Sequence, residues 1–195
     1  MQAATVFCSF LTLASFAAAA DYRVQANIRY SLHGETILDI LQARAPALKN
    51  RPGVIFIHGD DWSQGQKEDV VKQYCVPFIE HGFVVANIDY RLAGSAHAPA
   101  AVNDALAAAT WFQDRAPDYK VDPKQILVAG VSAGGELALM TAMVPESAGF
   151  GATIHIAAVI NFYGISDVAD LLDKRSFAAT WIKLVRLAGP FVPAI

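Results

Sequence analysis

The most informative stretch of this chain is Gln125-Ile-Leu-Val-Ala-Gly130-Val-Ser132-Ala-Gly134-Gly135. It holds a short apolar run that ends in Gly-x-Ser-x-Gly, and a helix-forming run over 136–143 follows at once. A strand, a sharp turn and a helix in that order are the setting of a nucleophile elbow. Gly130 and Gly134 leave room for the turn, because a Cβ there would strike the neighbouring strand or helix. The pattern predicts that the Ser132 hydroxyl projects from this turn.

A simpler interpretation is a turn of small residues that leads into an ordinary helix. The strand, turn and helix in register favour the nucleophile over that alternative. The helix start directly behind Ser132 would also supply free N–H groups and the positive end of a dipole. Both suit the negative charge that develops on a carbonyl oxygen under attack.

The composition is that of a single folded domain with a substantial core. The chain has 195 residues, of which 54% are hydrophobic and 17% charged, and its net charge is −3. Roughly 25% of residues are charged in an average soluble protein. Without a basic cluster, nucleic acid and anionic membrane surfaces are excluded as expected partners.

The first twenty residues carry no charged side chain, and Ala18-Ala19-Ala20 precedes Asp21. This pattern predicts a secretory signal peptide over 1–20, a mature domain over 21–195 and a secreted protein without a membrane partner. An uncleaved anchor is the alternative, although the apolar run is short for a membrane span.

Apolar runs and turn residues predict alternating strands and helices along the rest of the chain. The expected strands are 21–30, 36–43, 54–57, 83–88, 126–129 and 152–162, and the expected helices are 68–81, 100–115 and 136–143. Residues 38–43 also fit a helix on pattern alone. Continuously apolar strands that alternate with helices are typical of a parallel sheet covered on both faces, so the fold class is α/β.

Three motifs follow the third, fourth and fifth expected strands: His58-Gly-Asp-Asp-Trp62, Asp89-Tyr-Arg-Leu92 and Gly130-Val-Ser-Ala-Gly-Gly135. Together they resemble the α/β-hydrolase superfamily, and within it the esterase/lipase group of bacterial feruloyl-esterase-like and acetyl-xylan-esterase-like enzymes. The resemblance covers about residues 21–180. It implies a three-layer sandwich with a mostly parallel sheet and a serine hydrolase that acts on carboxylic esters.

The resemblance also implies a role for each motif residue. Ser132 would be the nucleophile, and the backbone N–H groups of Ala133 and of Gly59, Asp60 and Asp61 would form the oxyanion hole. His58 would orient that loop by hydrogen bonding.

This sequence has Asp60 and Asp61 where the group usually has glycines. A unit negative charge about 6 Å from the oxyanion would cost on the order of 3 kcal/mol at an effective dielectric constant of ~20. Carboxylates that point to solvent, the usual place for Asp on a surface loop, would avoid that cost.

In this fold the triad acid and histidine follow the serine in sequence. His155 is the one histidine after Ser132, and we expect it to be an ordinary residue of the strand 152–162. The triad acid and base would then lie beyond residue 195, with the sheet truncated after about the sixth strand and an aberrant tail over 175–195. Weak or undetectable turnover is the expected result.

The leading hypothesis is a serine esterase for short acyl, feruloyl or acetyl esters, free or on a carbohydrate. A non-catalytic binding protein or inactive fragment of the same fold, and a peptidase of the same superfamily, are the alternatives. No metal or cofactor site is apparent in the sequence. The last expected strand would present a free edge, so self-association through that edge is also expected.

Overall fold

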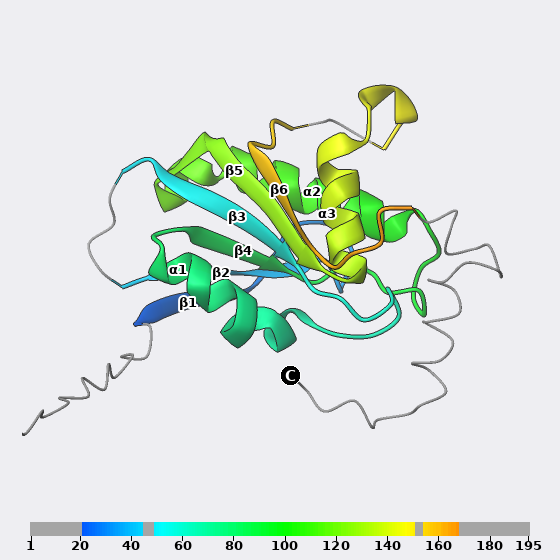
Figure 1. Cartoon of the computed structure of the whole chain (residues 1–195), viewed down its shortest axis with the longest axis horizontal. Helices are drawn as coiled ribbons and strands as arrows, with labels where there is room; N and C mark the ends of the chain where they lie inside the picture. The colour runs from blue at the N-terminus through cyan, green and yellow to red at the C-terminus, as the bar shows by residue number, and fades with distance from the viewer. Residues whose placement is uncertain (1–20, 45–48, 151–153, 168–195) are drawn as a thin grey trace, which may run out of the picture.

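A computed structural model describes residues 21–44, 49–150 and 154–167 of the chain. The expected signal peptide over 1–20 and the expected tail over 175–195 lie outside these ranges. Within the described ranges, six strands form one sheet in the order β1-β2-β4-β3-β5-β6 (Figure 1). They are β1 (Tyr22–Arg29), β2 (Ile37–Ala43), β3 (Arg51–Ile57), β4 (Val84–Ile88), β5 (Val121–Val131) and β6 (Ala158–Phe162).

The sheet is mostly parallel, as the sequence predicted. β3 pairs in parallel with both β4 and β5, and β5 pairs in parallel with β6. β1 and β2 form an antiparallel pair, and β2 is antiparallel to β4. The carboxyl ends of β3, β4 and β5 therefore meet at one edge of the sheet, which is where the three sequence motifs begin.

Helices cover both faces of the sheet, which gives the expected three layers (Figure 1). Side chains alternate along β3: Ile55 and Ile57 pack under α2 (Ala100–Asp114) and α3 (Ala133–Met143), whereas Val54 and Phe56 pack under α1 (Val76–Glu80). All four side chains are fully buried. Burying one such side chain is worth about 1.5–3 kcal/mol, so β3 anchors both cores.

The helix expected over 68–81 is three short helical segments in succession. A 3-10 turn over Lys67–Val70 leads into a π turn over Val71–Cys75 and then into α1. Pro77 stands in the first turn of α1 and has no N–H to donate, so a regular α-helix through this point would lack a hydrogen bond. Gly82, with φ of 84°, follows the last turn, as the sequence suggested.

Two other predictions needed correction. Residues 38–43 are part of strand β2, so the helical alternative is wrong. The expected strand over 152–162 is too long, because β6 begins only at Ala158 and residues 154–157 are not strand. The ladder with β5 starts where the Ala157 N–H donates to the Ile126 carbonyl at 2.8 Å, and residues 154–156 are not paired with β5. His155 is consequently an exposed residue of a connecting segment.

Within the described residues, no helix has the length and apolar character needed to cross a membrane.

Candidate active site

Ser132 occupies the turn between β5 and α3 and has backbone angles of φ 54° and ψ −118°. These angles are rare for a residue with a Cβ and cost on the order of 1–3 kcal/mol. Hydrogen bonds on both sides hold the turn: the Ser132 N–H donates to the Phe162 carbonyl at 3.0 Å, and its carbonyl accepts from Gly135 at 2.9 Å and Glu136 at 3.2 Å. The side chain is half-buried at the carboxyl edge of the sheet.

The glycines of the motif are required by contact between the turn and its neighbours. A Cβ on Gly130 would overlap the carbonyl of Gly134. A Cβ on Gly134 would overlap the carbonyl oxygens of Ile57 and His58, at the end of β3. The elbow is therefore packed directly on the loop that follows β3.

That loop also approaches the serine itself. An ideal Cβ on Gly59 would lie 2.8 Å from the Val131 carbonyl oxygen and 3.2 Å from the Ser132 Cβ. Across the described part of the chain, no group accepts a hydrogen bond from the N–H of Gly59, Asp60 or Ala133. Gly59 packs against the serine and Ala133 follows it in the chain, so these two N–H groups lie close to Ser132 on separate segments.

Asp60, Asp61 and Trp62 have positive φ angles of 74°, 55° and 55°. Three such residues in succession are unusual outside glycine, so the loop keeps a glycine-type conformation without the glycines. Asp60 is exposed, and its carboxylate turns toward Gly65, where an ideal Cβ would lie 2.9 Å from Oδ2. Asp61 is half-buried and lines a neighbouring cavity.

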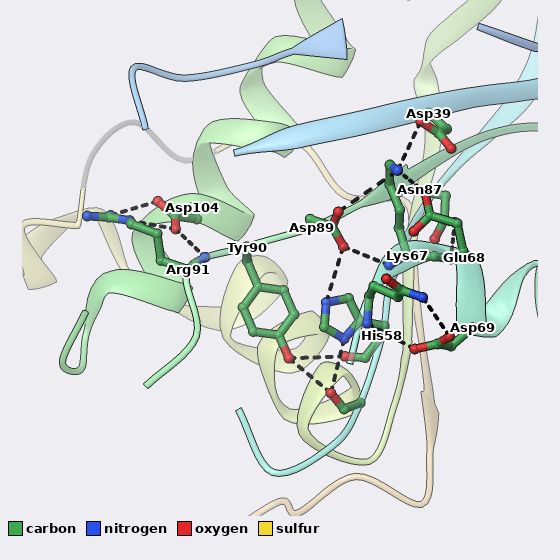
Figure 2. Close-up of polar contacts among 12 residues, drawn as sticks. Asp39, His58, Lys67, Glu68, Asp69, Asn87, Asp89, Tyr90, Arg91 and Asp104 are labelled. Carbon is green, nitrogen blue, oxygen red and sulfur yellow. Dashed lines mark hydrogen bonds and ion pairs between the residues drawn. The ribbon is translucent and has the colours of Figure 1, made fainter. Parts of the chain in front are cut away.

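His58 is buried beneath this loop. Its Nδ1 lies 3.1 Å from the Gly59 carbonyl oxygen, and its Nε2 lies 3.5 Å from Oδ1 of Asp89 (Figure 2). Its ring stacks on Tyr90 with centroids 4.5 Å apart. Burial lowers the pKa of His58, although the nearby Asp60 and the Gly59 carbonyl oppose that effect. A buried, neutral imidazole with these contacts fits a loop-orienting role.

The structure adds Tyr90 to the residues that hold the loop, a contribution that the sequence did not reveal. Its hydroxyl lies 3.3 Å from the carbonyl oxygens of both His58 and Gly59, so one proton is shared between two acceptors. Tyr90 is 1% exposed. The motif Asp89-Tyr-Arg-Leu92 was the only sequence signal for this contact.

Lys67 is a second residue beneath the loop after β3 that the sequence did not predict. We call His58, Lys67, Asp89 and Tyr90 the support of this loop. Lys67 is 2% exposed and lies between three carboxylates. Its Nζ lies 3.4 Å from Asp39 and 3.9 Å from Asp89, and it also contacts Glu68. Its N–H donates to Asp89 at 2.6 Å. Burial acts to lower the pKa of Lys67, but the carboxylates outweigh it and the pKa is raised. The ammonium thus ties the end of β4 to β2 and to the chain after the loop (Figure 2).

Arg91 and Asp104 form a bidentate ion pair beside the site, with Nε–Oδ2 at 2.8 Å and Nη2–Oδ1 at 2.7 Å. Asp104 is 2% exposed and belongs to α2. The pair fixes the segment between β4 and α2. Next to it, a cavity of about 330 Å³ separates this segment from Trp62 and from Glu136 on α3.

No general base approaches Ser132 within the residues that the structure describes. No side chain there makes a hydrogen bond to the Ser132 hydroxyl. His155 precedes the amino end of β6, where Ala158 lies beside Leu127, whereas Ser132 follows the carboxyl end of β5. In the same ranges, no group of three or more His, Cys, Asp or Glu side chains is arranged to hold a metal ion.

Comparisons with known proteins point to one family. The model of the family described as BD-FAE matches residues 38–188. Carboxylesterase NlhH of Mycobacterium tuberculosis is 34% identical over 103 residues, which are 51% of this chain and 31% of that protein. Probable carboxylic ester hydrolase LipM of the same species is 29% identical over 160 residues, which are 78% of this chain and 37% of that protein.

A solved structure with a similar fold is a truncated form of a carbohydrate esterase from gut microbiota. It has a TM-score of 0.71 at 24% identity and covers 79% of this chain, which in turn covers 61% of it. At that identity the likeness concerns the fold. The chain spans about a third of the length of the curated relatives it matches.

Proposed function

The chain belongs to the BD-FAE family of the α/β-hydrolase fold, and we propose that it is a serine hydrolase of carboxylic esters with Ser132 as its nucleophile. The observation that carries this proposal is the position of Ser132. It stands on a strained turn between β5 and α3, packed against Gly59 and directly before Ala133, and the N–H groups of both residues lack an acceptor within the described ranges.

The chemistry follows from that arrangement. The Ser132 oxygen attacks the ester carbonyl carbon, and the carbonyl oxygen takes up the negative charge opposite the N–H groups of Gly59, Asp60, Asp61 and Ala133. The bond to the alkoxy oxygen then breaks, and the alcohol leaves with the proton that the serine hydroxyl gave up. Water later attacks the acyl-serine, which releases the carboxylic acid and returns the proton to the Ser132 oxygen. Loss of one such backbone donor typically costs about 3–4 kcal/mol of transition-state stabilisation.

The proposed substrates are short acyl, feruloyl or acetyl esters, free or attached to carbohydrate. Relatives that match this chain are named carboxylesterase, probable carboxylic ester hydrolase and acetyl esterase, which supports ester hydrolysis over peptide hydrolysis. The outward turn of the Asp60 carboxylate supports an oxyanion hole that tolerates this residue.

Release of nitrophenolate from p-nitrophenyl acetate tests the proposal, with Ser132→Ala as the control. We expect one equivalent of nitrophenolate per protein, followed by turnover that is slow because no described side chain activates the serine or water. Removing a triad member leaves roughly 10³–10⁴-fold catalysis over water in serine proteases. Equal release by both proteins would contradict the proposal.

The second candidate is a non-catalytic protein of the same fold that binds an ester or a related ligand. It is favoured by one observation: in the described ranges, no histidine or carboxylate contacts the Ser132 hydroxyl. Saturable binding of an ester by wild type and by Ser132→Ala, without release of alcohol from either, is the result that would support it.

We also propose that the protein is exported by its first twenty residues. The support is the uncharged apolar sequence that ends in Ala18-Ala19-Ala20. Amino-terminal sequencing of secreted material is expected to begin at Asp21, and an intact Met1 terminus would contradict export by cleavage.

A further inference from the structure

The cavity next to the elbow is lined by the three segments that follow β3, β4 and β5. Trp62 comes from the first, Pro99 and Val102 from the second, and Glu136 and Leu137 from α3. Its volume is about 330 Å³, and most of its walls are alanine, proline, valine and leucine side chains. A site of this size and character holds a small apolar group and orients it through a few polar atoms.

Glu136 is the polar side chain that the elbow places at this cavity. It lies one helical turn after Ser132, and its N–H donates to the Ser132 carbonyl. It is 9% exposed, and its Oε2 accepts a hydrogen bond from Nε1 of Trp62 at 3.3 Å. This bond orients the carboxylate between the loop and the helix. In the described part of the chain, Glu136 has no cationic partner.

Arg91 also lines the cavity, but its charge is already neutralised. Both its Nε and its Nη2 donate to the carboxylate of Asp104, and Nη2 also reaches the Ala100 carbonyl at 3.5 Å. Asp61 is a further acidic group of the lining. Burial raises the pKa of Glu136, opposed by the Trp62 hydrogen bond, as expected for a carboxylate that lacks a counter-charge.

We propose that Glu136 sets the substrate specificity of this site: it accepts a hydrogen bond from a hydroxyl or ammonium group on the bound part of the substrate and rejects a carboxylate there. The inference rests on the proposed function, because Glu136, which lines the cavity, follows the reacting Ser132 by one turn of α3. A donor would give the buried carboxylate a second hydrogen-bond partner beside Trp62, and an ammonium group would also supply a counter-charge. A second carboxylate would instead place like charges together in an apolar pocket.

The test uses alkyl fluorophosphonates of equal length whose chains end in methyl, hydroxyl, ammonium or carboxylate groups. The second-order rate of Ser132 labelling is measured for each. In wild type we expect the hydroxyl and ammonium probes to react at least about tenfold faster than the carboxylate probe, which corresponds to about 1.4 kcal/mol. The ratio of hydroxyl to ammonium rates then distinguishes a neutral from a cationic substrate group.

Glu136→Gln removes the charge but keeps an oxygen that can accept from Trp62. We expect it to speed the carboxylate probe and slow the ammonium probe, each relative to the methyl probe, so that the preference shrinks about tenfold. Glu80→Gln makes the same charge change on α1, on the opposite face of the sheet, and should leave all four rates unchanged. Wild type without a preference against the carboxylate probe would overturn the inference, whether or not Glu136→Gln folds.

Failure of the proposed function gives a different result. If the methyl probe does not label wild type, Ser132 is not a nucleophile, and the cavity is then tested by binding alone. Titration with hexylammonium and with hexanoate is followed by the NMR signal of the Trp62 indole N–H, assigned with Trp62→Phe. We expect hexylammonium to shift this signal at lower concentration than hexanoate in wild type, and Glu136→Gln to abolish the difference. Equal responses in wild type would overturn the inference.

Discussion

Gly59 packs so closely against Ser132 that a methyl group on the glycine would lie 3.2 Å from the serine Cβ. The same methyl group would lie 2.8 Å from the Val131 carbonyl oxygen, which is backbone and cannot rotate away. The loop after β3 and the turn after β5 therefore behave as one packed unit at the carboxyl edge of the sheet. This contact brings the backbone of Gly59 close to Ser132.

Gly59→Ala should separate these two segments. The added Cβ must push the loop away from Val131 and Ser132, so we expect labelling of Ser132 by a fluorophosphonate to slow at least about tenfold as the oxyanion donors move. Overpacking of this kind typically costs about 1–3 kcal/mol of unfolding free energy. Gly34→Ala is the matched control, since a Cβ at Gly34 meets open space. Unchanged labelling in Gly59→Ala would place the reactive oxyanion site elsewhere.

Tyr90→Phe removes the hydroxyl that lies 3.3 Å from the carbonyl oxygens of His58 and Gly59. The ring and its stacking on His58 remain, so we expect the unfolding free energy to fall by only about 1 kcal/mol. The rate of Ser132 labelling should nevertheless fall clearly, because the loop after β3 loses the hydrogen bond that holds its His58 and Gly59 carbonyl groups. Tyr119→Phe changes a half-buried tyrosine on the far side of α2 and should do neither. If both substitutions slowed the labelling of Ser132 equally, the proposed role of Tyr90 in holding the loop would be contradicted.

Asp89 makes the unfolding free energy of the protein depend on pH. Burial raises its pKa to about 6, and Lys67 opposes that effect. In the unfolded chain the pKa of an aspartate is about 3.9, so the folded protein binds this proton more tightly. The stability contributed by Asp89 is then fully present below about pH 4 and is lost as the pH rises through about 6.

Urea unfolding of wild type and Asp89→Asn across this range measures the effect. We expect the difference in unfolding free energy, wild type minus variant, to be larger at low pH than at neutral pH. His58 faces the same carboxylate at 3.5 Å, so the titrations of the two groups are coupled and the difference reports on the pair. Lys67 keeps two other carboxylates, Asp39 and Glu68, when Asp89 is protonated. A difference that grows as the pH rises would contradict the assigned direction.

β6 pairs with β5 on one side, and no described strand pairs with its other edge. An apolar edge of this kind offers free N–H and C=O groups to another chain. We propose that the protein self-associates through β6, and sedimentation velocity over a wide range of concentrations should show growing assemblies. A single monomeric species at every concentration would contradict this proposal.

The sequence was sufficient for the order of strands and helices, because its apolar runs are short, continuous and bounded by glycine, proline or polar residues. It also located the turn at Ser132, since Gly-x-Ser-x-Gly needs that geometry. The sequence failed to predict where β6 begins. Ile154 and Ile156 continue the apolar pattern, but the pairing of β6 with β5 begins only at Ala158. Apolar periodicity predicts a strand but not where its partner begins.

The support beneath the loop could not be predicted in the same way. A buried Lys67 is rare, and nothing in the sequence shows that Asp39, Glu68 and Asp89 converge on it from three segments. The bond between Trp62 and Glu136 likewise joins residues that are 74 positions apart. Such contacts depend on tertiary packing, and only the structure reveals them.

Mass spectrometry of the protein after reaction with a fluorophosphonate tests the central claim most directly. We expect one adduct, located on the peptide that contains Ser132, and no adduct in Ser132→Ala. Adducts on other exposed serines such as Ser63 or Ser95, or a wild-type protein that remains unmodified, would contradict the assignment of Ser132 as the nucleophile.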